Sequence, residues 1–592
     1  MTDLGTSQRS GGAPDGAAPG EGTAAGGGPR AGGGPRAGGG PRAGAGTRRQ
    51  WSFRLWPPEI SGNTGTFDDW ARTVAASFKP AALWRNHRLF VIAVCVSIIP
   101  RVIAALGFKP ALLIQDSFSY MKQSVQLLPL AELRPAGYPL MLHALQPFHS
   151  LLLVTTVQHV MGILLGTIIY VVLRTRGLPA WGAVLAAAPT LFDSRQIWLE
   201  SSILPDTLFT LVLMIAVAIL VVRPKPAVWQ AAIVGLLVSY ASVIRGNGAP
   251  VFVVILIFLL IMRVGWKAFL ACVVAFVVPL GIYVAYFFSD HNQLNITDST
   301  GLFLWSRTMS FANCSIIKPP ANLVPLCPEN QPDHPTASAP AWSIPALLGE
   351  RTPADYLWDA GAWYRVDAHP GVNAYNNKLA MQFAERAILA QPGAYLATVG
   401  KEVLETFFTT DRSTDYLAMQ FTVTPHVNPE VAYMAYWENR YAYTKANTHL
   451  HQPWAYLMFL YQEPVWFPGV VFFFVMVAGL VLLIRRWRRG LGRLAFLAWG
   501  VAIVNLVLPI AAHELDYRYA ISAVPFACLA LGLTLVRKPV PGALGAPGVP
   551  GASSASGASS GSGASSGSGA SGGESAAVAA PPATGVETAA AD

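Results

Sequence analysis

Residues Leu113–Leu140 read LIQDSFSYMKQSVQLLPLAELRPAGYPL; they follow the first long apolar run but are too polar to span a bilayer. A helix that begins near Asp116 would place its apolar residues near one side and its small polar residues near another. The apolar set is Phe118, Met121, Val125 and Leu128, and the polar set is Ser117, Ser124 and Gln126. This pattern suits a helix lying flat at the membrane surface. Asp116 can either cap such a helix or act on a lipid-borne substrate at the water–lipid boundary.

The composition is that of a membrane protein. Of the 592 residues, 53% are hydrophobic and 12% are charged, with a mean hydropathy of +0.41, whereas soluble domains carry about 25% charged residues. Because the apolar residues gather in long runs, we expect a polytopic membrane protein. The net charge of +9 lies largely in short loops and tails, which indicates contact with anionic membrane lipid and not with nucleic acid.

Hydropathy predicts an all-α bundle of about ten transmembrane helices. The apolar segments run near 89–107, 151–173, 179–193, 206–222, 228–244, 249–264, 267–288, 464–484, 493–512 and 519–536. The chain then divides into a Gly/Pro/Arg repeat tail (1–50), a basic juxtamembrane segment (51–88), a first transmembrane module (89–288), an inserted domain (289–463), further spans (464–538) and a Gly/Ser/Ala-rich tail (539–592). The module would hold about seven spans and the later segment about three. Both tails are too poor in apolar residues to fold, so we expect them to be disordered.

Loop charges predict the side of the membrane on which each connection lies. Basic residues recur on alternate connections, for example at Arg485–Arg489, and such residues mark the cytoplasmic side. We therefore expect a protein of the plasma membrane with both termini in the cytoplasm and the 289–463 insertion outside. The insertion shows helical patterns near 376–390 and 393–408. It also contains Cys314 and Cys327, which can form a disulfide in an oxidising compartment.

Acidic residues gather in the second outer loop, D-S-R-Q-I-W-L-E-S-S-I-L-P-D, over Asp193–Asp206. Glu200 has apolar neighbours near the membrane, where a carboxylate is costly without a task or a partner, so we predict a functional role for it. Asp193 is either a helix cap or a second functional carboxylate. Asp206 follows a proline at the start of a span and is expected to interact with the helix dipole.

Cations and one histidine mark the other outer connections. Arg245 ends a span in the segment I-R-G-N-G-A-P, where its guanidinium can extend to lipid phosphate or hold the phosphate of a substrate. The last outer loop, A-H-E-L-D-Y-R-Y, brings His513, Arg518 and Tyr519 together with two acids. Acids from the first two loops could share a divalent cation, although no spacing requires one.

The sequence has no Walker loop, dinucleotide fingerprint, nucleophile elbow or H-E-x-x-H pair at a plausible site. A reaction outside the cytoplasm has no supply of nucleotide sugars or ATP. An activated donor would then have to be a lipid.

Four segments carry a resemblance to a known group of enzymes. They are D-S-F-S-Y at 116–120, R-P-A-G-Y-P-L at 134–140, L-E-S-S-I-L-P-D-T-L-F at 199–209 and D-Y-R-Y-A-I-S-A-V-P at 516–525. In this order the chain resembles the GT-C superfamily of polyprenyl-phosphate-dependent glycosyltransferases, which includes protein O-mannosyltransferases, aminoarabinose transferases and actinobacterial arabinosyltransferases. The resemblance implies a GT-C-like bundle with interfacial helices in the first outer loop and a mainly helical outer insertion.

The resemblance also implies an inverting transfer of a sugar from a polyprenyl-phosphate donor to an extracytoplasmic glycan, lipid or protein. Asp116 matches the position of the catalytic base. Glu200, or Asp193, would orient the acceptor or help to hold a metal. The first loop has Asp-Ser in place of a pair of acids, so the need for a divalent cation stays open.

The leaving phosphate of such a reaction needs cations close by. We predict Arg245 and Arg518 for this role, with Lys109 and Arg134 behind them. The other predicted substrate-binding residues are Tyr120, Tyr138, His513 and Tyr519.

Two other functions fit the same loops. A transporter or flippase for a lipid-linked sugar would bind the same molecule. Such a protein is expected to have charged or broken-helix sites near mid-membrane, and the sequence shows Gly and Pro but no buried charge cluster at that depth. A ligase or polymerase of lipid-linked glycans would share the chemistry and use a larger donor.

Overall fold

The structure, a computed structural model, describes residues 80–128, 130–131, 133–331, 352–359, 361–366, 368–408, 420–423, 431–443 and 448–536. The predicted tails and most of the basic segment 51–88 lie outside the described residues. Helices dominate the part that is described. Its one sheet is the antiparallel pair of β1 (Phe108–Lys109) and β2 (His449–Leu450).

Among the described residues, five helices are long and apolar enough to cross a membrane: α2 (Pro80–Gly107), α5 (Leu151–Thr175), α11 (Trp266–His291), α23 (Leu491–Ala512) and α24 (Tyr517–Leu535). Shorter apolar helices occupy the other predicted spans, namely α6 (Ala180–Phe192), α8 (Asp206–Val222), α9 (Val228–Ile244), α10 (Gly248–Ile261) and α22 (Gly469–Arg485). A short turn, η4 (Trp487–Arg489), joins α22 to α23. The all-α membrane class is confirmed, and the count of ten spans stays a prediction.

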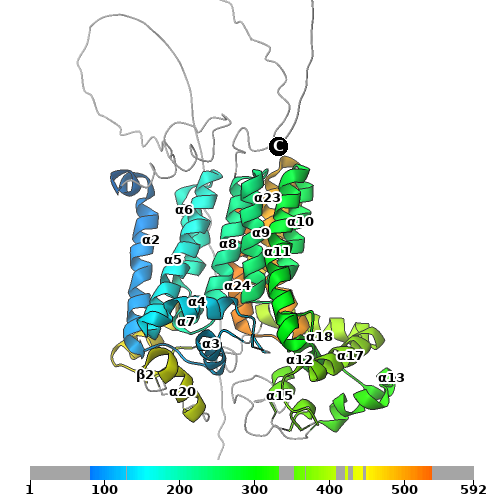
Figure 1. The fold of residues 1–592 in the computed structure, drawn as a ribbon. Coiled ribbons are helices and arrows are strands. Elements are labelled where there is room, and N and C mark those ends of the chain that lie inside the picture. The colour runs from blue at the N-terminus through cyan, green and yellow to red at the C-terminus, as the bar shows by residue number, and fades with distance from the viewer. Residues whose placement is uncertain are drawn as a thin grey trace, which may run out of the picture. The chain divides into compact units, whose positions relative to one another are not determined.

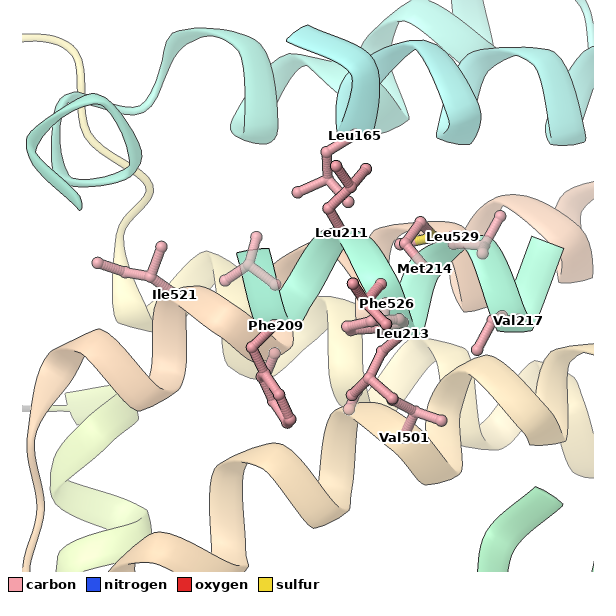
Figure 2. Packing of buried hydrophobic residues seen from close by; sticks show 14 of the residues in the cluster. Leu165, Phe209, Leu211, Leu213, Met214, Val217, Val501, Ile521, Phe526 and Leu529 are labelled. Carbon is pink, nitrogen blue, oxygen red and sulfur yellow. The ribbon is translucent and has the colours of Figure 1, made fainter. Parts of the chain in front are cut away.

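Helix α8 lies at the centre of the bundle and is buried almost all round, as expected for a helix that is apolar on every side. It packs against α5, α9, α23 and α24. Figure 2 shows side chains of α8 interleaved with those of its neighbours, among them Leu165, Leu211, Leu213, Met214, Val501, Phe526 and Leu529. This packing holds the first turn of α8, with Asp206, inside one end of the bundle.

Several helix ends meet at this same end of the bundle, which we call the site end (Figure 1). Helices α8 and α24 begin here and α9 ends here. Short helices lie beside them, namely α3 (Gln115–Val125), α4 (Gly137–Leu145), η1 (Gln146–Phe148) and α7 (Ser194–Ser201). The connections 108–150 and 193–205, which the sequence predicts to be outer loops, thus supply the short helices at the site end.

Helix α3 differs from the surface helix that its sequence predicts. It begins at Gln115 with Ile114 as its N-cap, so Asp116 lies in the first turn and is not the cap. Residues of both the apolar and the polar set, such as Phe118 and Ser124, are buried, because α3 packs against both α4 and α20 (Val431–Ala442). The helix is therefore enclosed by protein on more than one side.

The insertion between α11 and α22 is mainly helical, as predicted. Besides α20 its helices are α12 (Thr300–Thr308), α13 (Cys314–Ile317), η2 (Ala321–Leu326), η3 (Pro328–Asn330), α15 (Pro353–Trp358), α16 (Trp363–Val366), α17 (Ala374–Ala390), α18 (Pro392–Phe408) and α21 (Trp454–Gln462). A core separate from that of the bundle forms around Trp305, Tyr364 and Phe383. The predicted pair Cys314 and Cys327 forms a disulfide, and closing a loop of this size contributes about 3 kcal/mol of stability.

Candidate functional site

Asp116 is held between two arginines at the site end. Arg134 donates from Nη2 to Oδ1 of Asp116 at 2.5 Å, and Arg518 donates from Nη1 to Oδ2 at 3.0 Å. The three residues come from α3, from the loop before α4 and from the first turn of α24. Each side chain keeps between 16% and 20% of its surface exposed, so a ligand can reach them.

A second ion pair lies beside the first. Arg245, the C-cap of α9, donates to Asp206 in the first turn of α8. The ring of Tyr519 lies between the two ion pairs: its centroid is 4.5 Å from the guanidinium of Arg245 and 5.4 Å from that of Arg518. We call the charged residues gathered here the ionic cluster: Asp116, Arg134, Asp206, Arg245, Asp516 and Arg518.

Gly137 allows the first outer loop to approach α9 closely. A Cβ atom at this position would lie 2.5 Å from backbone atoms in the last turn of α9, so any larger residue would push the loop away. Tyr240 of α9 also donates its hydroxyl to the carbonyl of Gly137 at 3.0 Å. The R-P-A-G-Y-P turn thereby brings Arg134 to the same place as Arg245.

Two of the three predicted tyrosines, Tyr120 and Tyr138, are buried beneath the cluster. Tyr120 and Tyr138 pack edge to face with their centroids 5.2 Å apart, and the guanidinium of Arg134 lies 5.8 Å from the ring of Tyr120. Tyr138 is 0% exposed and donates its hydroxyl to Gln158 at 2.8 Å. We therefore assign Tyr138 a structural role instead of the predicted contact with substrate.

Charge decides the ionisation of Asp116. Burial alone would raise its pKa, but the charges of Arg134 and Arg518 outweigh burial and lower the pKa of Asp116 to about 2. Asp116 is therefore a carboxylate at physiological pH, and it is a weak base while both arginines hold it. Three polar atoms of the cluster, Nε of Arg134, Nε of Arg518 and Oδ2 of Asp206, are buried with no hydrogen-bond partner of good geometry among the described residues, although Nε of Arg518 forms an ion pair with Asp516. Such atoms can be satisfied by a polar ligand.

Glu200 lies in a separate and closed network. Arg101 of α2 donates to both carboxylate oxygens, at 2.8 and 2.9 Å, and Nδ1 of His159 in α5 lies 3.0 Å from Oε2. Gln196 donates to Oε1 at 3.1 Å, and the side chain of Glu200 is 0% exposed. Arg101 thus neutralises the buried carboxylate, and the closed network leaves no access for a substrate to Glu200. We assign Glu200 a structural role in place of the predicted catalytic one.

The same network is a buried charge cluster that the sequence did not reveal. Arg101 and His159 both lie inside long apolar helices. Gly162 of α5 makes room for the network, because a Cβ atom there would lie 1.7 Å from Oε1 of Glu200. The charges were not visible as a cluster in the sequence, since Arg101 and Glu200 are 99 residues apart.

Asp193 takes the first of its two possible roles. Its Oδ1 accepts the backbone N–H of Arg195 at 2.8 Å, so it caps α7. It also lines one end of an apolar cavity of about 960 Å³ between α6, α22 and α24, together with residues such as Leu185, Trp466 and Leu531. Asp193 therefore does not belong to the ionic cluster, and its predicted contact with the acceptor gains no support.

His513 follows α23 and is buried against the insertion. Its Nδ1 lies 3.0 Å from the hydroxyl of Ser306, and its ring packs edge-on against Phe303 at 4.9 Å. Burial, together with the charge of Arg307, lowers the pKa of His513 to about 3, so the imidazole is neutral at physiological pH. Because Phe303 also lies 6.0 Å from the guanidinium of Arg134, His513 lies on the flank of the ionic cluster.

An ion pair that the sequence did not indicate braces this flank. Arg307 of α12 is 0% exposed and donates to Glu402 of α18 at 2.7 Å and to the carbonyl of His513 at 3.0 Å. Glu402 also accepts the backbone N–H of Leu515 at 2.9 Å. The insertion thus holds the loop that leads into α24 and Arg518.

The described residues do not fit a bound divalent cation. Their one group of three close metal-ligand side chains is Cys314, Cys327 and Glu329, and the two cysteines are joined in the disulfide. In the ionic cluster a guanidinium group lies against each acid, and Oδ2 of Asp206 is the one buried carboxylate oxygen of the cluster without a hydrogen-bond partner among the described residues, whereas a cation held by protein side chains needs several such oxygens. Asp116 and Glu200 lie in separate networks, so the cation that acids of the first two loops could share has no site in this conformation.

Lys109 lies in β1, where it pairs through its backbone with His449 of β2. Of the ion pairs between described residues, none joins Lys109 to the ionic cluster. The predicted supporting role of Lys109 in phosphate binding therefore gains no support from the geometry.

No family model matches this chain. No curated protein and no solved structure matches it either. The resemblance to GT-C enzymes therefore stays a prediction, and the function is argued from the geometry of the ionic cluster.

Several residues at the site end were missed or misread in the sequence. Asp206 was explained by the helix dipole alone, although it pairs with Arg245. Arg101, Arg307 and Glu402 were not singled out. A charge inside an apolar run, as at Arg101, was the one available signal, because such a charge requires a partner.

Proposed function

We propose that this protein is a membrane glycosyltransferase that moves a sugar from a polyprenyl-phosphate donor to an acceptor outside the cytoplasm, with inversion at the anomeric carbon. The observation that carries the proposal is the meeting of Arg134, Arg518 and Arg245 around Asp116. Guanidinium groups are well suited to hold phosphate through paired, charge-assisted hydrogen bonds. About ten spans and a site end that faces outside, both predicted from hydropathy and loop charges, complete the proposal.

In the proposed reaction Asp116 is the general base. The acceptor hydroxyl attacks the anomeric carbon and its proton passes to the carboxylate of Asp116. The bond from that carbon to the phosphate oxygen breaks, and polyprenyl phosphate leaves with the electron pair. The arginines of the cluster would stabilise the negative charge on the leaving phosphate.

The pairing of Asp116 with arginines gives donor binding a second effect. A donor phosphate would compete with Asp116 for Arg134 and Arg518. As the arginines turn to the phosphate, the pKa of Asp116 would rise towards its usual value and the carboxylate would become a better base. The base would therefore be most active when the donor is in place.

The apolar cavity between α6, α22 and α24 supports a lipid-borne substrate. Its lining residues run from Gly177 in the α5–α6 connection to Trp466 before α22, and the lining is mostly apolar. Near Trp466 the guanidinium of Arg195 lies 5.0 Å from that ring and 5.1 Å from the ring of Tyr517, the neighbour of Arg518. A hydrocarbon chain in the cavity would thus end near the ionic cluster.

One observation favours a transporter, namely the buried cluster of Arg101, Glu200 and His159. This cluster is fully paired and closed to solvent. Arg101 lies about 9 Å along the helix from the end of α2 at Gly107, at a rise of about 1.5 Å per residue. The midplane of a bilayer is deeper, at about 15 Å from the edge of the hydrocarbon core. The cluster therefore resembles a structural brace more than a mid-membrane binding site.

The test is a transfer assay with purified protein in nanodiscs. A panel of radiolabelled polyprenyl-phosphate sugars would be offered together with cell-envelope acceptors, with and without a chelator. Release of polyprenyl phosphate with labelling of an acceptor supports the proposal, and we expect the chelator to have no effect. Donor binding without release of polyprenyl phosphate from any donor would favour a transporter.

Replacing Arg245 by alanine is expected chiefly to weaken donor binding, with a smaller fall in kcat. Loss of one charge-assisted hydrogen bond costs about 1.5–3 kcal/mol, so the donor KM should rise by about 10- to 100-fold. Arg245→Lys keeps the positive charge but loses the forked pair of N–H donors, so its donor KM should lie between those of the unchanged protein and of Arg245→Ala. A donor KM that is unchanged in a folded Arg245→Ala protein would remove Arg245 from the phosphate site.

The pH dependence should differ between kcat/KM and kcat. For the donor, kcat/KM reports the free protein, in which the pKa of Asp116 is about 2, so it should stay flat from about pH 8 down to about pH 4. His513 adds no titration there, because its pKa is about 3. Since kcat reports the donor complex, in which the pKa of Asp116 is higher, kcat should begin to fall at a higher pH. Parallel acid limbs would contradict the competition between phosphate and Asp116.

A further inference from the structure

Helix α18 carries both buried and exposed apolar side chains. One face packs against α22 and α23 and buries residues such as Val399 and Phe407. The other face is exposed and consists of Leu396, Ala397, Gly400, Leu404 and Phe408. Leu396 is 67% exposed and Leu404 is 55% exposed. We call this second face the outer face of α18.

The outer face is open within the described part of the chain. It forms a shallow trough, and a Cβ atom added at Gly400 would meet no atom within 4 Å. The charged residues beside the trough, Lys401 and Glu405, lie 3.7 Å apart and pair with each other. The face is thus an apolar stripe whose neighbouring charges are neutralised.

The neighbouring helix α17 shows what a water-exposed face in this insertion looks like. It has the same length as α18, and its exposed residues include Lys378, Glu385 and Arg386. Both helices belong to the insertion and follow each other in sequence. Because α17 also exposes Tyr375 and Leu389, its exposed residues mix charged and apolar side chains, whereas the apolar residues of the outer face of α18 are contiguous.

Contacts at the two ends of α18 show at which end of the bundle this helix lies. Near its start, Tyr395 donates its hydroxyl to the carbonyl of Ala511, in the last turn of α23. At its end, Phe408 packs at 4.9 Å against Phe473, in the first turn of α22. Both contacts lie where apolar bundle helices end at the site end. Because its two ends meet the same end of the bundle, α18 lies across the bundle and not along it.

The apolar outer face is continuous with an exposed apolar face of α22. Phe473 packs against Phe474 at 5.6 Å, and Phe474 is 62% exposed. Further exposed apolar residues follow at helical spacing along α22, namely Val477, Val481 and Ile484. An exposed apolar face on a bundle helix of a membrane protein is what contacts lipid. The outer face of α18 therefore adjoins the exposed apolar face of α22.

We propose that the outer face of α18 is a lipid-binding surface, which lies in the interfacial layer of the membrane leaflet at the site end. An amphipathic helix with an apolar stripe lies in this layer with its axis along the membrane plane. Lys401 extends its charge towards the headgroups. The partner is the bilayer itself, and Glu402 on another side of the same helix braces the loop before α24 through Arg307.

The test places spin labels on the full-length protein in vesicles of phosphatidylcholine and phosphatidylglycerol. Labels are attached at Leu404→Cys and, separately, at Ala397→Cys, in a chain whose free cysteines Cys95, Cys272 and Cys528 are replaced by alanine. Lys378→Cys on α17 is the matched water-exposed control. We expect labels at 404 and 397 to collide more with membrane-dissolved oxygen than with a water-soluble nickel chelate, and the label at 378 to show the reverse.

The outcomes separate the bilayer from other partners. Oxygen-dominated collisions at both positions of α18 support the proposal. Nickel-dominated collisions at 404 and 397 would overturn it, because the face would then be in water. Dipolar broadening between labels on two copies of the chain would also overturn it, since a second copy would then cover the face. The measurement needs no transfer assay, so it stands or falls separately from the proposed glycosyltransferase activity.

Discussion

Replacing Asp116 by asparagine is expected to lower the rate of sugar transfer by about 10²- to 10⁴-fold, the usual contribution of a positioned general base. Asparagine has almost the same shape as aspartate but cannot take up the proton of the acceptor. The change also removes the ion pairs that Asp116 makes with Arg134 and Arg518, while Arg518 keeps its pair with Asp516, so donor phosphate should bind at least as tightly as before. The expected signature is a large fall in kcat with a donor KM that is unchanged or lower.

Asp516→Asn is the matched control for this variant. Asp516 also pairs with Arg518, at 2.5 Å, and it caps α24. Asparagine caps a helix as well as aspartate does, so the control removes one negative charge from the same arginine and keeps the fold. We expect a small change in kcat. Near-normal turnover of Asp116→Asn in the transfer assay, or an equal loss in both variants, would reject Asp116 as the base.

The sequence was sufficient to predict which helix ends meet. Apolar runs that alternate with basic connections place the ends near Asp116, Arg245 and Arg518 on one side of the membrane. The structure brings these residues together at the site end. An expectation of this kind can be drawn from the sequence because each segment carries its own hydropathy and loop charge, and the side of the membrane stays a prediction.

The pairing of individual charges could not be predicted in the same way. The sequence predicts a functional role for Glu200 because no partner for its charge is visible nearby. Its partner Arg101 lies 99 residues earlier in the chain. Arg307 and Glu402 meet over a separation of 95 residues. Such pairs depend on how helices rotate against each other, and the spans are too uniformly apolar for the sequence to fix that rotation.

Replacing Arg101 by methionine is expected to have the largest effect on stability. The change would leave the carboxylate of Glu200 buried at 0% exposure without its main partner, and removal of one member of a buried ion pair costs about 3–5 kcal/mol. Methionine fills most of the space of the arginine side chain, so loss of packing should contribute little. The measurement is the thermal unfolding temperature in nanodiscs, which we expect to fall markedly.

The double variant Arg101→Met with Glu200→Met separates a structural brace from a catalytic acid. Replacing both members of a buried ion pair by apolar side chains of similar volume is often neutral or stabilising, so the double variant should unfold at a higher temperature than Arg101→Met alone. If Glu200 only holds α7 against α2 and α5, the double variant should also retain most of its transfer activity. A double variant that is stable but inactive would restore the catalytic role that the sequence suggested for Glu200. The comparison is informative because the network around Glu200 and the ionic cluster around Asp116 share no ion pair among the described residues.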